Sequence, residues 1–280
     1  MCLELPEVKT VVKALKSNIK NAKITDVFVF LDKLIKNVSP QEFKEYLLNE
    51  TILDIYNVGK NIIFKLSKDK NLISHLRMTG KYFTDTSLHH KRKHDYVIFE
   101  LNNQMYLFYN DSRQFGTFHI KDESELFTTK PLDKLGKEVD QIDPDKLYQL
   151  IKNKTIPIKS FLLDQSYILG IGNIYANEIL YLSGVNPWTK VNKIPYAKLI
   201  QILNNTKIIL DKATELGGST IVDFSGLNGA EGQFQNHLQV HMRANLPCNK
   251  CKTLIKQETI AQRMTYYCPL CQKENYEQEK

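Results

Sequence analysis

The sequence predicts an α+β protein of two domains, in which a β-sandwich flanked by helices precedes a helical domain and a small metal-binding module. Three observations support this fold class. Short β-branched and aromatic runs fill residues 24–120, helical periodicity dominates after residue 142, and four of the five cysteines form two C-x-x-C pairs near the end of the chain. A chain of 280 residues can bury two separate cores.

The first half of the chain is expected to form the β-sandwich. Closely spaced strands favour two packed sheets, and seven runs have this character: ITDVFVFL, TILDIYNV, NIIFKL, NLISHL, YVIFEL, MYLFYN and GTFHI. Apolar residues recur at helical spacing from Val8 to Ile19, and Pro6 stands where a first helical turn tolerates proline, which predicts a first helix. A second helix is predicted in SPQEFKEYLLNE, with Ser39 as its N-cap.

The second half of the chain is predicted to be helical. Helical spacing occurs in DPDKLYQLIKN, IPIKSFLLDQ, GNIYANEILYLSG and PYAKLIQILNNTKIILDKATEL, and the Gly-, Ser- and Asn-rich residues 217–236 predict a mobile loop. The polar stretch with Pro131 and Gly136 is typical of a linker. We therefore expect a sandwich domain at 1–130, a linker at 131–142, a helical domain with this loop at 143–236 and a metal module at 237–273.

The charge of the chain is moderately basic. A net charge of +7 and a pI near 8.9 suit a polyanionic partner, but they are equally compatible with an ordinary solvated surface. The chain has no apolar run of the roughly 18 residues that a membrane span needs, and its first residues lack the apolar centre of a secretory signal. We expect a cytoplasmic protein with no membrane partner.

The cysteine pairs predict a metal site. In a reducing compartment, two C-x-x-C pairs separated by sixteen residues favour tetrahedral Zn²⁺ over disulfides, and the ligands are Cys248, Cys251, Cys268 and Cys271. Four thiolates leave no open coordination position, so one structural zinc ion is expected. The alternative is a set of unligated core cysteines. Arg263 lies between the pairs, where it suits a phosphate contact, although taken alone it is a solvated charge.

Two further motifs have the chemistry of nucleic-acid binding. In GIGNIYANEIL, two glycines precede a helix whose N-terminal N–H groups can bind phosphate, and Asn173 adds a side-chain donor; a tight interhelical turn is the alternative. In HLRMTG and DSRQFG, the residues Met78, Arg113 and Phe115 are suited to enter a base stack and fill the space left by an extruded base. Residues of these types beside strands are more often part of a core.

Together the motifs resemble the formamidopyrimidine-DNA glycosylase and endonuclease VIII family of base-excision enzymes. ELPEV, HLRMTG, DSRQFG, IKSFLLDQ, GIGNIYANEIL, GGSTIVDF and AQRMTYYCPLCQ occur in the family's order, from Glu4 to about Lys273. HLRMTG, the Met/Arg/Phe trio and the four-cysteine finger favour the formamidopyrimidine and 8-oxoguanine branch. The resemblance implies that the helical domain has a helix-two-turn-helix fold.

The resemblance also implies an activity. Such enzymes are bifunctional DNA glycosylases and AP lyases of base-excision repair, combining glycosidase (hydrolase) and lyase chemistry on oxidised purines. They extrude the damaged nucleotide, displace its base by attack of the N-terminal amine on C1′, and cut the strand through a Schiff base. An α-amine suits this step because its pKa near 7.7 to 8.0 leaves a useful neutral fraction. The implied partner is double-stranded DNA with damaged bases or abasic sites, bound by a monomer.

Catalytic roles of the family transfer by motif to four residues, and a phosphate-binding role transfers to a fifth. Glu4 would be the general acid that opens the sugar ring, and Glu7 a supporting carboxylate in the first helical turn. Lys60 would contact phosphate and donate a proton in β-elimination. Arg263 would hold the phosphate beside the lesion and serve δ-elimination, and Asn173 would complete this phosphate clamp.

Further DNA contacts transfer in the same way. His94 and Arg113 match DNA-contacting positions of the family. A third such position, a lysine in the family, falls on Thr155, with Lys154 one residue before it. The loop expected to close over the extruded base begins with Gly218, Ser219 and Thr220.

The chain departs from the family at its front. Where the family has a proline as the terminal amine, directly before the catalytic glutamate, this chain has Leu3, with Cys2 ahead of it. If Met1 is removed, the amine belongs to Cys2 and lies one residue too far out. One residue spans about 3.3 to 3.6 Å, whereas a misplacement of ~1 Å can already slow catalysis ~100-fold.

Several interpretations of this departure remain open from the sequence. We favour an active glycosylase and lyase that uses the Cys2 amine, because Glu4, Lys60 and Arg263 are all present. The alternatives are a catalytically impaired protein that binds lesions or abasic sites, an abasic-site crosslinking trap in which Cys2 forms a thiazolidine, and an inert terminal cysteine. A zinc-ribbon interaction module that does not bind DNA would explain the cysteines but not the order of the other motifs.

Overall fold

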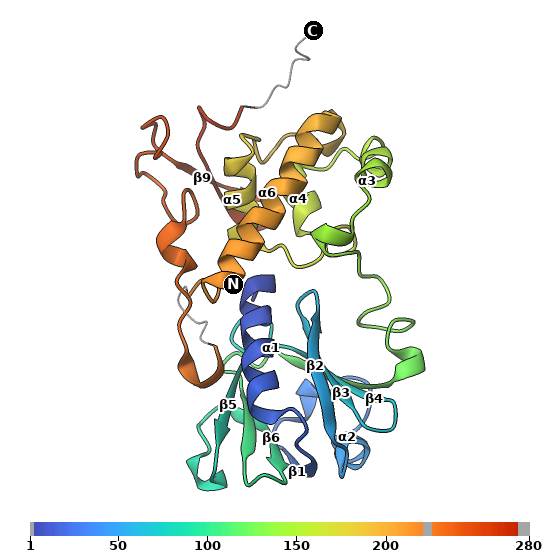
Figure 1. Cartoon of the computed structure of the whole chain (residues 1–280). Helices are drawn as coiled ribbons and strands as arrows, with labels where there is room; N and C mark the ends of the chain where they lie inside the picture. Colours follow the sequence, from blue (N-terminus) through green and yellow to red (C-terminus); the bar gives the residue numbers. More distant parts are fainter. Residues whose placement is uncertain (1–2, 221–225, 274–280) are drawn as a thin grey trace. The chain divides into compact units, whose positions relative to one another are not determined.

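The computed structural model describes residues 3–220 and 226–273 (Figure 1). These residues divide into two compact units. The first unit takes in the chain up to Lys134 together with Leu216–Gln235, and the second takes in Leu135–Glu215 and the chain from Asn236 onward. The segment Leu216–Gln235, which follows the long helix Tyr196–Glu215, therefore belongs to the same unit as the start of the chain.

The first unit is a β-sandwich of two antiparallel four-stranded sheets, which confirms the predicted fold class. One sheet has the order β1-β6-β7-β5 and the other β2-β3-β4-β8. The strands are β1 (Ile24–Val29), β2 (Ile52–Val58), β3 (Asn61–Leu66), β4 (Lys70–His75), β5 (Lys81–Asp85), β6 (Asp95–Leu101), β7 (Tyr106–Asn110) and β8 (Thr117–Asp122). Seven coincide with the predicted runs, and β5 was not predicted because KYFTD is short and directly follows HLRMTG.

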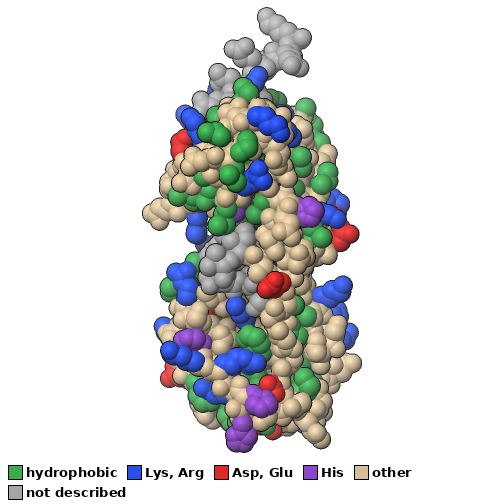
Figure 2. All heavy atoms as spheres, turned by 90° about the vertical axis from the view of Figure 1, so that its left-hand side faces the viewer, with side chains coloured by type: hydrophobic (Ala, Val, Ile, Leu, Met, Phe, Trp, Pro, Cys, Tyr) green, Lys and Arg blue, Asp and Glu red, His purple; other side chains and the backbone are tan. Residues whose placement is uncertain are grey.

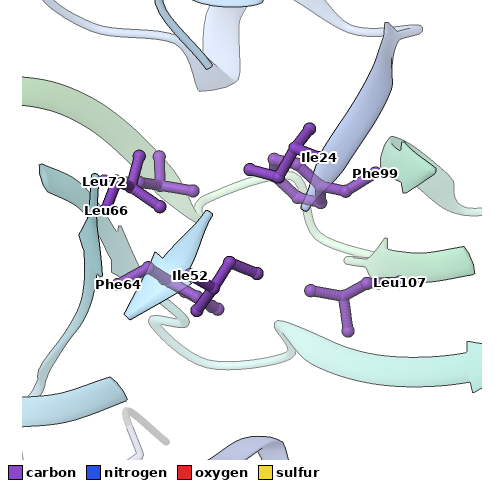
Figure 3. A pocket seen from close by; sticks show the side chains of 7 residues that line it. All are labelled: Ile24, Ile52, Phe64, Leu66, Leu72, Phe99 and Leu107. Carbon is purple, nitrogen blue, oxygen red and sulfur yellow. The ribbon is translucent and has the colours of Figure 1, made fainter. Parts of the chain in front are cut away.

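The core of the sandwich is apolar and closely packed. Alternate residues of both sheets face inward and leave a small apolar cavity (Figure 3), which is lined by Ile24, Ile52, Phe64, Leu66, Leu72, Phe99 and Leu107. The helix α1 (Leu5–Ile19) adds Val8, Val11, Leu15 and Ile19 to the same core. Each such side chain contributes roughly 1.5–3 kcal/mol when fully buried, so the core fixes where α1 begins.

The sequence also predicts a second helix, and the structure adds several short 3₁₀ turns. The second predicted helix is α2 (Pro40–Leu47), and Ser39 caps it by accepting a hydrogen bond from the Glu42 backbone N–H, as expected. Short 3₁₀ turns are η1 (Asp32–Leu34), η2 (Leu88–His90), η3 (Glu123–Glu125), η4 (Val139–Gln141), η5 (Val191–Lys193), η6 (Leu227–Gly229) and η7 (Phe234–His237).

The second unit contains four longer helices and a two-stranded hairpin. All four predicted helical segments form helices: α3 (Pro144–Ile151), α4 (Ile158–Leu163), α5 (Asn173–Leu182) and α6 (Tyr196–Glu215). The hairpin consists of β9 (Lys256–Ile260) and β10 (Arg263–Tyr267), which lie between the two cysteine pairs. Among the described residues, the helices are too short or too polar to cross a membrane.

A buried carboxylate fastens one end of the sandwich. Glu50 is 1% exposed, and its side chain accepts hydrogen bonds from the Ser67 hydroxyl and from the Lys68 and Lys70 ammonium groups, the latter two at 3.0 and 2.9 Å. Burial alone would raise the pKa of Glu50, but these hydrogen bonds outweigh burial and lower the pKa from 4.5 to about 2.

Glu50 should therefore make folding stability depend on pH. Because its folded pKa is depressed, its contribution is fully present above pH 4.5 and is lost as the pH falls toward about 2. Glu50→Gln should lower the free energy of unfolding by about 2–3 kcal/mol at pH 7, and urea titrations should show this difference shrinking between roughly pH 5 and 3. The exposed Asp133→Asn is the control; a pH-independent loss in Glu50→Gln would contradict the assignment.

Candidate active site and nucleic-acid interface

The start of α1 holds two buried carboxylates. Glu4 occupies the N-cap position and is 1% exposed, while Glu7, in the first turn, is 2% exposed. The Glu4 backbone N–H donates to Glu7 Oε2 at 3.1 Å, so Glu7 satisfies one of the backbone donors that a helix N-terminus leaves unpaired. The sequence-predicted pair is thus brought together on one rigid helical turn.

Glu7 also holds the beginning of the loop that follows α6. Its Oε1 accepts a hydrogen bond from the Ser219 backbone N–H at 2.8 Å. Gly218 has a φ of +81°, and a Cβ at this position would lie 2.8 Å from Glu7 Oε1. The close approach and the left-handed backbone both require glycine. Thr220 continues the segment, with its N–H donating to Gln235 Oε1 at 3.0 Å.

The residue at the family's proline position lies in a tight environment. Leu3 is 5% exposed and packs into the sandwich core. Its backbone N–H donates to the Arg77 carbonyl oxygen at 2.7 Å. The Leu3 nitrogen is therefore a hydrogen-bonded peptide nitrogen, which is not nucleophilic. Cys2, like residues 221–225 of the loop, lies outside the described residues.

Two adjacent loops carry the predicted wedge residues. Met78 is half-buried in the turn between β4 and β5, and Arg113 and Phe115 are exposed in the loop between β7 and β8. The Arg113 guanidinium lies 5.2 Å from the centre of the Phe115 ring, which is 53% exposed. Phe115 is thus not a core residue.

The loops next to the wedge are rich in basic side chains. His94 Nδ1 lies 3.2 Å from the Tyr96 hydroxyl, which also accepts a hydrogen bond from Gln114 Nε2 at 2.9 Å, so His94 adjoins the Arg113 loop. Lys60 lies in the β2–β3 turn, and its charge contributes to the low pKa of His75. Burial, Arg77 and Lys60 together lower that pKa to about 3, so His75 is neutral.

The surface of the first unit reflects this composition. Figure 2 shows Lys, Arg and His side chains on the side of this unit where β5 lies. The segment that connects β5 to β6 contributes His89, His90, Lys91 and Lys93, which are exposed. Such a basic surface attracts a polyanion before any specific contact forms.

The second unit carries the predicted phosphate clamp. Asn173 begins α5, and its Nδ2 donates to the Met264 carbonyl at 3.0 Å. Lys159 of α4 is fully buried and donates to the same carbonyl at 3.1 Å and to Thr265 Oγ1 at 2.8 Å. These bonds fix β10 against the helices, and the exposed Arg263 is its first residue. Asn173 and Arg263 therefore lie on one braced structure.

Other residues of the second unit support this region but have no sequence signal. Glu178 is buried and accepts backbone N–H bonds from Gln239, Val240 and His241 at 2.8 to 3.0 Å. Burial and the charge of Lys159 lower the pKa of His241 to about 3, and His241 Nδ1 bonds Asn177 at 2.8 Å. Asn177 and Glu178 lie in the motif GIGNIYANEIL, in which only the two glycines and Asn173 are predicted to bind phosphate.

Lys154 has a different setting from the clamp residues. Its ammonium lies 4.8 Å from the centre of the Tyr167 ring, and its carbonyl accepts a hydrogen bond from the Asn192 N–H at 3.2 Å. Thr155, at the family's lysine position, is exposed. These contacts with Tyr167 and Asn192 tie Lys154 to the helical unit, and neither of them involves Asn173 or Arg263.

The four paired cysteines form a site of the size that zinc requires. All four Sγ atoms lie within 4.8 Å of one another, with Cys248 and Cys271 at 3.8 Å and Cys251 and Cys268 at 3.4 Å. A tetrahedron with Zn–S bonds of about 2.3 Å has edges of about 3.8 Å. Four thiolates at this spacing repel one another unless a cation lies between them. The donor set therefore fits one structural Zn²⁺ held by all four sulfurs.

Comparison with known proteins assigns three segments of the chain. Residues 2–118 match the model of the formamidopyrimidine-DNA glycosylase N-terminal domain, residues 135–225 that of its H2TH domain, and residues 245–273 that of the zinc finger found in FPG and IleRS. The chain belongs to the formamidopyrimidine-DNA glycosylase family. The sequence-based resemblance, the predicted zinc finger and the helix-two-turn-helix domain are thereby confirmed.

Individual members of the family match nearly the whole chain. The chain is 44% identical over 272 residues to the formamidopyrimidine-DNA glycosylase of Mycoplasma mobile, covering 97% of this chain and 99% of that protein. The enzyme of Mycoplasma genitalium is 40% identical over 273 residues, with 96% and 95% covered.

Solved structures of the Lactococcus lactis enzyme are also similar. A complex of that glycosylase with DNA containing Fapy-dG, crystallised as a mutant, superposes with a TM-score of 0.91 at 33% identity. A complex with DNA containing an abasic site gives the same values, and both cover 96% of this chain and 99% of that one.

The zinc site can be tested by metal analysis. The purified protein should contain one zinc ion per chain, and Cys251→Ser should lose it because three thiolates leave the tetrahedron open. Mass spectrometry of the native protein or a chelator dye would measure the content. Cys2→Ser is the matched control and should keep its zinc; full zinc content in Cys251→Ser would refute the ligand assignment.

The contact between Gly218 and Glu7 predicts a selective loss of stability. Gly218→Ala combines left-handed backbone strain with a Cβ 2.8 Å from Glu7 Oε1 and should lower the free energy of unfolding by about 2 kcal/mol. Gly229→Ala is the matched control, because its φ is +86° but a Cβ there meets nothing within 4 Å, and it should lose about 1 kcal/mol. Equal losses in urea unfolding would show that the Glu7 contact is unimportant.

Proposed function

We propose that the chain excises oxidised purines, formamidopyrimidines and 8-oxoguanine, from duplex DNA and nicks the strand at the resulting site. Family membership supports a DNA glycosylase of base-excision repair. The observation that carries the assignment most directly is the buried pair Glu4 and Glu7 beside the N-terminus, with Glu7 bonded to Ser219 of the predicted base-covering loop. A protein that only bound DNA would have less use for two buried carboxylates there.

The proposed chemistry begins with the neutral N-terminal amine. It attacks C1′ of the extruded nucleotide, the N-glycosidic bond breaks, and the base leaves with the bonding electrons and takes up a proton. The Glu4 carboxyl group gives a proton to O4′ as the C1′–O4′ bond opens, and the amine nitrogen loses its proton to form the imine. Removal of a C2′ proton then expels the 3′ phosphate by β-elimination, and a second elimination expels the 5′ phosphate.

The amine is proposed to be that of Cys2, released by removal of Met1. Leu3 does not supply it, because its peptide N–H is bonded to Arg77. A primary α-amine still forms an imine, and its pKa near 7.7 to 8.0 leaves part of it unprotonated at neutral pH. The extra residue leaves the amine less constrained than the terminal proline that the resemblance implies for the family. We therefore expect a lower rate of base excision.

The other predicted residues serve binding in this proposal. Arg263 and Asn173 hold the phosphate beside the lesion, with Arg263 aiding δ-elimination, and Lys60 contacts phosphate and donates the proton of β-elimination. Met78, Arg113 and Phe115 fill the gap in the duplex, and His94 and Lys154 contact its backbone. The protein acts as a monomer in the cytoplasm, on the DNA of the nucleoid.

The test is cleavage of a duplex that carries 8-oxoguanine opposite cytosine. Wild-type protein should cut the lesion strand, leave an unmodified duplex intact, and form a covalent adduct with abasic-site DNA under borohydride. Glu4→Gln should slow cutting by about 100-fold or more, within the range that loss of a general acid produces. Denaturing gels measure both, and retarded but uncut DNA in the wild type would reject the enzyme assignment.

Cys2 provides the matched control for the nucleophile. Cys2→Ser removes the thiol but keeps the α-amine, so cutting and borohydride trapping should persist. Peptide mapping of the trapped adduct should place the DNA on the amine of residue 2, after mass spectrometry has established that Met1 is removed. An adduct on another residue would contradict the Cys2 assignment, and an adduct that needs the thiol but no borohydride would indicate a thiazolidine.

A further inference from the structure

One buried carboxylate in the first unit joins several loops that the proposed function uses. Asp111 follows β7, and its side chain is 0% exposed. Its Oδ1 accepts hydrogen bonds from the Thr79 hydroxyl and from the Arg113 N–H, the latter at 3.2 Å. Its Oδ2 accepts from the Gly116 N–H at 2.8 Å and from the Tyr109 hydroxyl at 3.3 Å. All four partners donate to Asp111, and a carboxylate, which only accepts hydrogen bonds, can pair with all of them.

These hydrogen bonds connect the two wedge loops to each other. Thr79 follows Met78 directly, and its hydroxyl both donates to Asp111 and accepts from the Arg113 N–H at 3.2 Å. The bond to Gly116 closes the other loop just beyond Phe115. Met78, Arg113 and Phe115 are therefore anchored at their backbones through one side chain.

The Tyr109 hydroxyl packs closely against the backbone of both wedge loops. A Cβ at Gly80 would lie 2.6 Å from the Tyr109 hydroxyl oxygen, and a Cβ at Gly116 would lie 1.6 Å from it. The hydroxyl thus fills the space between the last residues of both motifs, and burial and the charge of Asp111 raise its pKa well above 10.0, so it remains a donor. The Tyr109 hydroxyl therefore limits how closely the two loops can approach each other.

Asp111 also reaches the His94 loop. Its backbone N–H donates to the His94 carbonyl at 3.0 Å. Three segments that the proposed function assigns to DNA, around Met78, His94 and Arg113, therefore meet at one residue that is itself too buried to touch DNA. Its role can only be exerted through the residues it holds.

We infer that Asp111 is a positioning residue that presets the Met78–Arg113–Phe115 wedge, with Thr79 as its partner, so that base extrusion requires little rearrangement of the protein. A wedge held in its working geometry loses less conformational freedom when it enters the stack. The inference rests on the proposed function. It separates two steps: excision of a paired 8-oxoguanine depends on the wedge, whereas cleavage at an abasic site, which has no base to extrude, depends on it much less.

The test compares Asp111→Asn and Thr79→Val with Thr79→Ser. The asparagine amide turns an NH₂ toward groups that donate, and valine removes the hydroxyl without changing the shape. Single-turnover excision from an 8-oxoguanine duplex should fall about tenfold or more in the first two variants, while abasic-site cleavage should stay within about threefold of wild type. Thr79→Ser keeps the hydroxyl and should restore excision.

Fluorescence measures the wedge without catalysis. A duplex with an uncleavable tetrahydrofuran site and 2-aminopurine opposite it should change emission when wild-type protein binds, and Asp111→Asn and Thr79→Val should reduce this change. Glu50→Gln loses a buried carboxylate that bonds Ser67, Lys68 and Lys70 instead of these loops. It is the control for a general loss of stability and should leave excision and emission unchanged. An unaltered emission change in folded Asp111→Asn, or equal loss of excision and abasic cleavage, would overturn the inference.

The proposed function and the inference fail in different ways. A wild-type protein that cuts neither substrate would refute the glycosylase assignment. The emission change would still report whether Asp111 and Thr79 set the wedge, because it needs binding alone.

Discussion

Burial of a carboxylate beneath a loop is the interaction on which the candidate site depends. Glu7 accepts the Ser219 N–H, Asp111 accepts the N–H groups of Arg113 and Gly116, and Glu178 accepts three successive N–H groups from Gln239 to His241. Each loop otherwise leaves peptide donors without a strand or helix to satisfy them. A buried carboxyl group accepts these hydrogen bonds and gives an irregular segment one backbone geometry, so that an exposed neighbouring side chain is held in place.

Local patterns accounted for most of the fold and for the metal site. The N-cap at Ser39 and the helical repeat from Val8 to Ile19 depend on neighbours within a few residues, and the cysteine pairs form a recognisable pattern along the chain, so the sequence alone predicts them. β5 was missed because five residues directly after a turn carry too short a pattern. Its position became evident only through pairing with β7.

The supports of the site could not be predicted in the same way. Glu7 and Ser219 are 212 positions apart, and Lys159 reaches Thr265 across 106 positions, so no periodicity relates either pair. Asp111 and Thr79 lie in the motifs DSRQFG and HLRMTG, but the chemistry that these motifs predict belongs to their neighbours Met78, Arg113 and Phe115. A small polar side chain next to a strand end, within such a motif, indicates a residue that holds the backbone of the loop in place. At the front, the sequence showed that Leu3 departs from the family, and the structure added that its nitrogen is bonded to Arg77.

The path of the chain between the two units has a consequence for how the protein is made. Leu216–Gln235 returns to the first unit after the helices of the second, and Gln233 and Phe234 bond back to Leu216 and Gly218. A ribosome that has released the eight strands of the sandwich has not yet supplied the segment that pairs with Glu7. During synthesis, Glu7 at the start of α1 therefore has no Ser219 N–H to bond until the second unit's helices have been synthesised. The segment Leu216–Gln235 is therefore the last part of the first unit to be synthesised, and a chain cut after Lys134 lacks it.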